Sequence, residues 1–200
     1  MERNQNSPLP GNSQTPVPLL YSGILFLLTV AFSVVPLFGF LSAVSKHHGT
    51  SSSPLFLGSL FLGGGVVAYC PRRYFEVHRW ERGGRVYITL GVRFFGLLVP
   101  NGGGINRIVR PFQPDYRVVR SRGSIADLET RTRGAELFHM AILITILPSA
   151  IYAILLGWAA YGVMLTLPNI PLHVYPILLQ RYTRARIERF SQHVYLRPSK

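Results

Sequence analysis

Residues 137–180, LFHMAILITILPSAIYAILLGWAAYGVMLTLPNIPLHVYPILLQ, form a run of 44 residues without Asp, Glu, Lys or Arg. A helix rises about 1.5 Å per residue and a membrane span needs about 20 apolar residues, so the run is far too long for one span. Gly157 offers a turn near its middle. The run therefore predicts two spans, near 137–156 and 160–180.

The N-terminal part of the chain predicts two further spans. Residues 19–44 carry no formal charge and contain Pro36, at which we expect a kink. The alternative for this run is a cleaved signal peptide, but the apolar stretch is too long and the tail before it holds only Arg3 as a basic residue. Residues 54–70 are apolar too, and the glycines 63–65 in their middle predict a face for close helix packing.

The charged residues lie outside these runs and set the expected orientation. The chain has 21 Lys and Arg against 8 Asp and Glu, a formal net charge of +13. Residues 71–136 hold thirteen arginines and six acidic residues. Basic loops stay in the cytoplasm, so an even number of spans predicts that both termini are cytoplasmic. Within this loop, residues 86–100 are too short to span and predict an interfacial or re-entrant segment.

These features predict an all-α polytopic protein of the cell membrane. It would have about four transmembrane helices and a basic cytoplasmic loop containing the interfacial segment. Residues 1–18, rich in Asn, Gln, Ser and Pro, predict a disordered tail. We expect a single membrane domain over 19–188 and a basic C-terminal tail over 189–200.

Several classes of chemistry have no signature in the chain. Cys70 is the single cysteine, which excludes an intrachain disulfide and a cysteine zinc cluster. The nucleotide-binding loop, the dinucleotide glycine fingerprint, the serine-hydrolase elbow and the zinc-protease motif are all missing. We predict no metal ligands and no bound cofactor.

The first group of candidate site residues lies at the start of the third span. Arg133, Glu136 and His139 are spaced three apart and share one face of a helix. A carboxylate beside an imidazole favours a general base, which acylation of an alcohol requires. We therefore predict that His139 and Glu136 are catalytic. The alternative is an interfacial Arg–Glu pair with a histidine that reaches toward the headgroups.

The second group lies at the end of the fourth span. Three prolines between 168 and 176 predict a bent or opened helix there. Asn169 and His173, four residues apart, share a face within the bilayer, where polar groups are costly and indicate function. The hairpin topology brings this end of the fourth span back to His139. The predicted substrate-binding residues, placed to hold a phosphate-bearing donor, are Arg133, Asn169, Gln180, Arg181, Tyr182 and Arg184.

At these two groups the sequence resembles a known family. Thr132-Arg133-x-Ala135-Glu136-Leu137-x-His139, then Asn169-x-Pro171, and Gln180-Arg181-Tyr182-x-Arg184-x-Arg186 are similar to the glycosyl-4,4′-diaponeurosporenoate acyltransferases. The likeness covers roughly residues 70–188 and departs at Thr183, where the family usually has Asn. It implies a small bacterial membrane enzyme that esterifies a sugar hydroxyl of a staphyloxanthin-type carotenoid.

The function predicted from these observations is membrane-bound transfer of a fatty acyl group to a sugar hydroxyl of a glycosylated carotenoid or other glycolipid. An acyl-CoA or acyl-carrier donor would be the co-substrate, and the oligomeric state stays open. The alternative is a non-catalytic scaffold or assembly protein whose arginines bind anionic lipid. Nucleic acid is not an expected partner, because the basic residues lie beside spans without interleaved aromatic residues.

Overall fold

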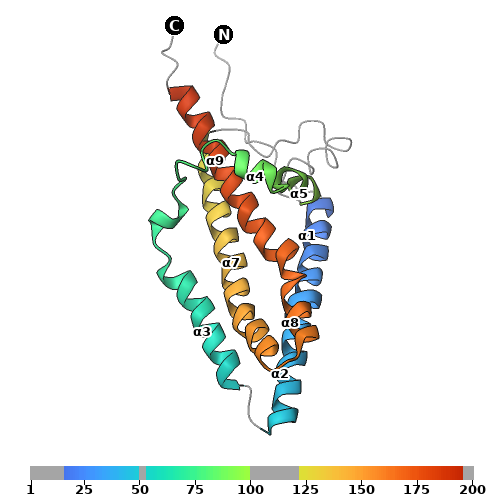
Figure 1. The fold of residues 1–200 in the computed structure, drawn as a ribbon. Helices are drawn as coiled ribbons and strands as arrows, with labels where there is room; N and C mark the ends of the chain where they lie inside the picture. Colours follow the sequence, from blue (N-terminus) through green and yellow to red (C-terminus); the bar gives the residue numbers. More distant parts are fainter. Residues whose placement is uncertain (1–15, 50–52, 100–121, 196–200) are drawn as a thin grey trace, which may run out of the picture.

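The computed structural model describes residues 16–49, 53–99 and 122–195, and these residues form helices and turns without a strand. Figure 1 shows helical passes that alternate in direction along the bundle, so that α1 begins at the same end of the bundle at which α9 ends. The elements, in chain order, are α1 (Pro16–Thr29), η1 (Val30–Val34), α2 (Val35–His48), α3 (Ser53–Tyr69), η2 (Arg72–Phe75), α4 (Arg85–Thr89), α5 (Val92–Leu98), α7 (Arg122–Leu155), α8 (Ala159–Thr166), η3 (Ile170–Val174) and α9 (Tyr175–Tyr195).

Three of the passes are long and apolar enough to cross a membrane, namely Gly23–His48, Ile125–Leu155 and Ala159–Gln192. The remaining pass, α3, has 17 residues and a length of about 25 Å, slightly less than the roughly 30 Å hydrocarbon core. Three spans are therefore supported, and a fourth stays a prediction.

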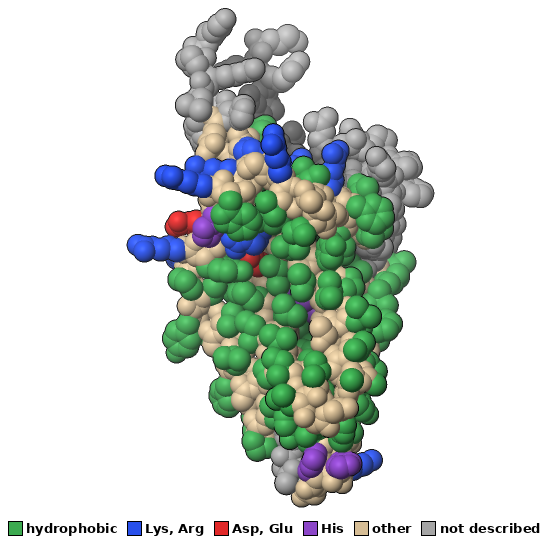
Figure 2. Space-filling model, in the orientation of Figure 1, with side chains coloured by type: hydrophobic (Ala, Val, Ile, Leu, Met, Phe, Trp, Pro, Cys, Tyr) green, Lys and Arg blue, Asp and Glu red, His purple; other side chains and the backbone are tan. Residues whose placement is uncertain are grey.

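The sides of the helical bundle, which we call the shaft, carry exposed apolar side chains that can face lipid. Large apolar side chains such as Phe61 and Leu155 are exposed by 79% and 77%. Figure 2 shows hydrophobic side chains along the whole shaft, with Lys and Arg gathered at one end and a smaller group of His and Lys at the other. Apolar side chains this exposed are stable only where lipid or protein covers them. The fold is that of a membrane protein.

Two π-helical segments interrupt the long passes, and each ends two residues before a proline. The segment η1 precedes Pro36, and η3 precedes Pro176. Proline lacks the N–H that continues an α-helix, and a π turn accommodates the lost hydrogen bond. The predicted opening of the last helix at its prolines is therefore confirmed. At Pro36, where a kink was expected, the helix has a π turn and continues on either side.

Two glycines act as predicted. Gly157 joins α7 to α8 with a positive φ of 76°, which favours glycine, and this confirms the turn between the last two passes. A Cβ added to Gly63 of α3 would overlap Thr145 of α7 and lie 2.8 Å from the Ala141 carbonyl oxygen. The close contact of α3 with α7 depends on that glycine. A Cβ on Gly64 or Gly65 would meet no atom within 4 Å, so only one of the three glycines forms the predicted packing face.

Several element boundaries differ from the sequence prediction. The helix α7 begins at Arg122, so the expected loop 71–136 is helical over its last fifteen residues. The helix α9 continues to Tyr195 instead of ending near 180, through most of the expected tail. Hydropathy marks only the apolar part of a helix, whereas both helices extend as charged turns beyond the apolar run. Most of the expected N-terminal tail lies outside the described residues, and α1 begins at Pro16.

The segment predicted to be interfacial forms the short helices α4 and α5, which lie across one end of the bundle in Figure 1. Tyr87 and Val92 are buried there against Leu179 of α9. Gly96 of α5 approaches the same leucine closely, since a Cβ on it would lie 3.2 Å from Leu179 Cδ1. The pair of short helices thus fixes the end of the bundle at which the candidate site lies.

Candidate functional site

A buried carboxylate on α7 receives hydrogen bonds from two arginines of α9. The helices α7 and α9 are antiparallel neighbours, and helical side chains lean toward the N-terminus of their own helix. Glu136 on α7 and the arginines of α9 therefore lean toward each other. Arg184 donates to Glu136 Oε2, and Arg181 Nη1 donates to Oε1 over 3.3 Å. Glu136 is fully buried, and Arg184 is 4% exposed.

A second carboxylate, Glu81, holds Arg181 from the opposite side. Arg181 donates to it through Nε over 2.7 Å and through Nη2 over 3.1 Å. The hydroxyl of Tyr87 and the N–H of His78 also donate to Glu81. Burial alone would raise the pKa of Glu81, but these hydrogen bonds outweigh it and lower the pKa to about 2. Glu81 is therefore ionised at neutral pH in the folded protein.

Aromatic rings from η2 cover the guanidinium groups. The Arg181 guanidinium lies 5.0 Å from the centre of the Tyr74 ring, and that of Arg184 lies 5.4 Å from the Phe75 ring. Arg133 lies 6.0 Å from the same Phe75 ring. Rings at this distance attract cations and exclude water. The segment after α3 thus closes the site over the end of α7 and α9.

We call Glu81, Glu136, Arg181 and Arg184 the ion network. Its two carboxylates and two guanidinium groups balance in formal charge. Arg181 is occupied by both carboxylates, whereas Nε and Nη1 of Arg184 are buried and have no hydrogen-bond partner among the described residues. A buried donor without a partner is costly. Arg184 is therefore the member of the network with N–H groups that have no partner among the described residues, and both of these nitrogen atoms are buried.

A second cluster lies deeper in the bundle, and we call it the polar chain: His139, His173, Ser33 and Asn169. His139 Nδ1 and His173 Nδ1 are 3.1 Å apart, and His173 Nε2 is 3.2 Å from Ser33 Oγ. Ser33 Oγ donates to Asn169 Oδ1 over 2.8 Å. His173, Ser33 and Asn169 are buried, while His139 is partly accessible. His139 is three residues beyond Glu136, so it lies about 4.5 Å farther along α7.

The expected pairing of Glu136 with His139 is replaced by two separate sets of contacts. Glu136 bonds to the arginines of α9, and the His139 ring faces His173. Arg133 bonds to Glu129 at 2.5 Å, one turn earlier on α7. The helix face holds all three residues as predicted, but their partners come from α9, from η3 and from within α7.

The other predicted substrate-binding residues, Asn169, Tyr182 and Gln180, lie in different environments. Asn169 meets His173 through Ser33, which agrees with their expected position on one face. Tyr182 packs its ring 5.9 Å from that of Tyr87 and helps to fix α4. Gln180 is half-buried.

Glu81 and Ser33 are members of the site that the sequence did not predict. Glu81 is one of several acidic residues in the arginine-rich segment, and no spacing distinguishes it. Ser33 carried a usable signal, because it is a hydroxyl inside an apolar run three residues before a proline. His173 has the same position relative to Pro176.

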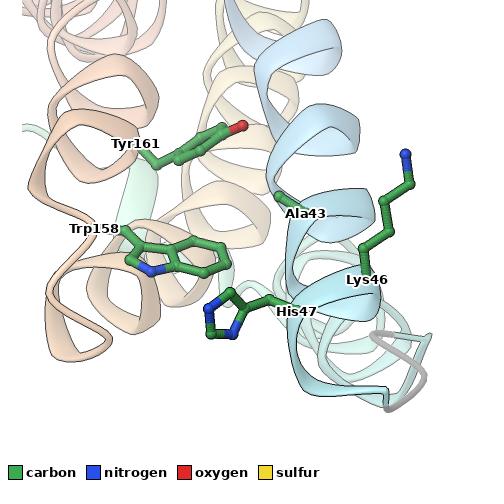
Figure 3. A pocket seen from close by; sticks show the side chains of 5 residues that line it. All are labelled: Ala43, Lys46, His47, Trp158 and Tyr161. Carbon is green, nitrogen blue, oxygen red and sulfur yellow. The ribbon is translucent and has the colours of Figure 1, made fainter.

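A hollow lies at the other end of the bundle and is separate from this site. It has a volume of about 520 Å³ and is lined by Ala43, Lys46, His47, Trp158 and Tyr161. Figure 3 shows the His47 ring directed toward Trp158, while the amine of Lys46 points away from it. The hollow therefore presents aromatic surface with no convergent charge, as is common at a membrane interface.

Comparison with known proteins places the site within one family match. Residues 71–193 match the model of the family described as glycosyl-4,4′-diaponeurosporenoate acyltransferase, which is more than half of the chain. The match contains the ion network, His139, His173 and Asn169, and it leaves Ser33 outside. No curated protein and no solved structure matches the chain.

Proposed function

The chain belongs to the glycosyl-4,4′-diaponeurosporenoate acyltransferase family, and we propose that it is a membrane-bound O-acyltransferase of carotenoid biosynthesis. The proposed reaction moves a fatty acyl group from a thioester donor, acyl-CoA or an acyl carrier, to a sugar hydroxyl of a glycosylated carotenoid or similar glycolipid. A thioester and an alcohol give an ester and a thiol, so no further reactant is needed.

The observation that carries the proposal is a partly accessible imidazole about one helical turn from a buried guanidinium with unused donors. His139 supplies the imidazole, and Arg184 lies against Glu136 of the preceding turn. Acyl transfer needs a base for the hydroxyl proton and donors for the oxygen on which negative charge develops. The arrangement offers both at the boundary between the apolar shaft and the charged end.

In the proposed mechanism the oxygen of the sugar hydroxyl attacks the carbonyl carbon of the thioester, and His139 accepts the proton of that hydroxyl. Nε and Nη1 of Arg184 donate to the carbonyl oxygen or to a phosphate of the donor. The proton then passes from His139 to the departing thiolate. Glu136 and Glu81 hold the arginines in place, so their role is positioning and not proton transfer.

The surroundings of the site support a lipid-like acceptor reached from the membrane. The charged end carries the arginines of α9 and the interfacial helices α4 and α5. We propose that this end faces the cytoplasm, with both termini on the same side. The acyl chain and the carotenoid would then lie along the apolar shaft while the sugar and the thioester meet at the headgroup level.

The proposed activity is tested with purified protein in lipid nanodiscs. The protein is supplied with a glycosylated carotenoid carboxylic acid and palmitoyl-CoA, and the products are analysed by mass spectrometry. We expect a new species heavier by one palmitoyl group, with release of free CoA in equal amount. Nanodiscs without the protein are the control for nonenzymatic transfer.

The proposal would be contradicted if neither palmitoyl-CoA nor palmitoyl-acyl-carrier protein gave the acylated product. Binding of anionic vesicles without transfer would instead favour the lipid-binding scaffold, because the arginines alone suffice for that interaction.

The two arginines of α9 should respond differently to replacement by lysine. Both substitutions keep the charge, so neither alters the orientation in the membrane. Arg184→Lys removes the unused N–H donors, and we expect kcat/KM for the acyl donor to fall on the order of tenfold. Arg181→Lys breaks the two-point contact with Glu81, and we expect a lower unfolding temperature with little change in kcat/KM of the folded protein.

Measuring donor kinetics and thermal unfolding on both variants separates recognition from folding. Wild-type kinetics in Arg184→Lys would remove that residue from the donor site and leave it as a partner of Glu136 alone.

A further inference from the structure

The two π-helical segments place polar side chains at equivalent positions inside the bundle. Ser33 is the fourth residue of η1 and lies three residues before Pro36. His173 is the fourth residue of η3 and lies three residues before Pro176. Single π turns within α-helices are frequent at functional sites. Here the two turns bring together residues 140 positions apart in the sequence.

These side chains belong to a hydrogen-bonded series that ends on a backbone carbonyl. Asn169 Nδ2 donates to the Leu165 carbonyl oxygen over 2.5 Å, and Asn169 Oδ1 accepts from Ser33 Oγ over 2.8 Å. Ser33 Oγ is 3.2 Å from His173 Nε2, and the two histidine Nδ1 atoms are 3.1 Å apart. The series therefore crosses from the first pass of the bundle to α7 by way of the last pass.

The carbonyl at the end of the series dictates the direction of every hydrogen bond in it. A carbonyl only accepts, so the atom of Asn169 beside Leu165 is the amide nitrogen, and its oxygen must accept from Ser33. The Ser33 hydroxyl donates its only proton to Asn169 Oδ1. Its oxygen must then accept from His173, which places the His173 proton on Nε2.

The tautomer of His139 follows from that of His173. With its proton on Nε2, a neutral His173 has a bare Nδ1 that accepts. His139 must then donate from Nδ1, and its own Nε2 carries the free lone pair. Any reversal along the series would set two acceptors or two donors against each other. Such a mismatch is expensive in an apolar bundle that excludes water.

We propose that Ser33 is a positioning residue that, through His173, holds His139 in the tautomer with an unprotonated Nε2. This inference rests on the proposed role of His139 as the general base, because a base needs its lone pair free before it meets the hydroxyl. Ser33 lies outside residues 71–193, so the N-terminal helix adds to a site whose other members lie within the family match. The site is incomplete without that helix.

A second buried serine provides a matched control. Ser149 of α7 is fully buried like Ser33, but its hydroxyl has no hydrogen-bond partner among the described residues. Ser33→Ala and Ser149→Ala therefore remove the same group from similar depth in the bundle. They differ in whether the hydroxyl belongs to the polar chain.

The tautomers can be observed directly by nitrogen NMR on the full-length protein labelled with [15N]-histidine. At pH 8 an ordinary imidazole with a pKa near 6.5 is neutral, so each ring carries one N–H. The His139 and His173 signals are assigned by their loss in His139→Asn and His173→Asn. We expect a proton on Nδ1 of His139 and on Nε2 of His173. A bare Nδ1 on His139 would overturn the proposal without any use of an activity measurement.

The variants then test the part played by Ser33. In Ser33→Ala we expect a mixture of His139 tautomers and a fall in kcat on the order of tenfold at unchanged KM. Ser33→Thr retains the hydroxyl and should keep the wild-type tautomer, while Ser149→Ala should match wild type in both measurements. Unchanged His139 signals in Ser33→Ala would overturn the proposal, as would an acyl adduct on Ser33 in the intact mass, since that would make it a nucleophile. Full activity in His139→Asn would instead contradict the proposed function and leave the tautomer result standing.

Discussion

His139→Asn is expected to lower kcat by a factor on the order of 10² or more while the protein remains folded in the membrane. General-base catalysis contributes about 10²–10⁴-fold, and an amide nitrogen does not accept a proton. The asparagine amide can still donate to His173 Nδ1 from about the place of the lost Nδ1, so the buried imidazole keeps a partner. The loss would therefore report chemistry and not folding.

His139→Ala is expected to lower both activity and stability, whereas His139→Asn is expected to lower activity alone. Alanine leaves His173 Nδ1 buried without a donor, which costs about 1–3 kcal/mol of stability. We expect both variants to be inactive and only the alanine variant to unfold at a lower temperature.

His78→Asn serves as the control, because the His78 side chain is 53% exposed and its Nδ1 is 3.2 Å from Glu81 Oε2, whereas the backbone N–H, which the substitution keeps, makes the shorter contact of 2.8 Å. Its kcat should stay near wild type. Near-wild-type turnover in His139→Asn would show that the imidazole is not the base, and the histidine pair would then be only a packing feature of the bundle.

The architecture could be predicted from the sequence to the extent that it depends on local hydropathy. The uncharged run 137–180 had to form two passes, and Gly157 supplied the left-handed turn between them. The π segments precede Pro36 and Pro176, whereas Pro148 lies within the continuous helix α7. What hydropathy could not locate is the start of α7 at Arg122, since its first turns are charged and are stabilised by contacts such as that of Glu129 with Arg133.

The sequence could predict the residues of the candidate site that share a helix face, but not their partners on other helices. The family resemblance and the intramembrane polar residues identified His139, Asn169 and the arginines of α9. Their partners follow from tertiary contacts: Arg181 meets Glu81 across 100 positions, and Ser33 meets Asn169 across 136. Helical spacing suggested Glu136 as the partner of His139, but the longer arginine side chains of the antiparallel α9 reach that carboxylate.

The largest expected effect on stability belongs to Glu136→Ala. This substitution leaves Arg184 buried without its carboxylate, and removing one partner of a buried ion pair costs about 3–5 kcal/mol. That is a large part of the roughly 5–15 kcal/mol by which a typical domain is stable. We expect little folded protein in detergent by size-exclusion chromatography, and a strongly lowered unfolding temperature for what remains. Glu129→Ala is the matched control, because its pair with Arg133 is 42% exposed on each side and should contribute at most about 1 kcal/mol.

Removing the arginine together with the carboxylate separates folding from recognition. In Glu136→Ala/Arg184→Met the uncompensated charge is gone, and apolar replacement of a buried pair is often neutral. We therefore expect the double variant to regain most of the lost stability. Its acyl transfer should stay low, because the N–H donors of Arg184 are missing whether or not the bundle is intact. Recovery of both stability and activity would show that the pair only holds α7 to α9. A double variant as unstable as Glu136→Ala would mean instead that the carboxylate matters through Arg181 and Glu81, which the substitution leaves in place.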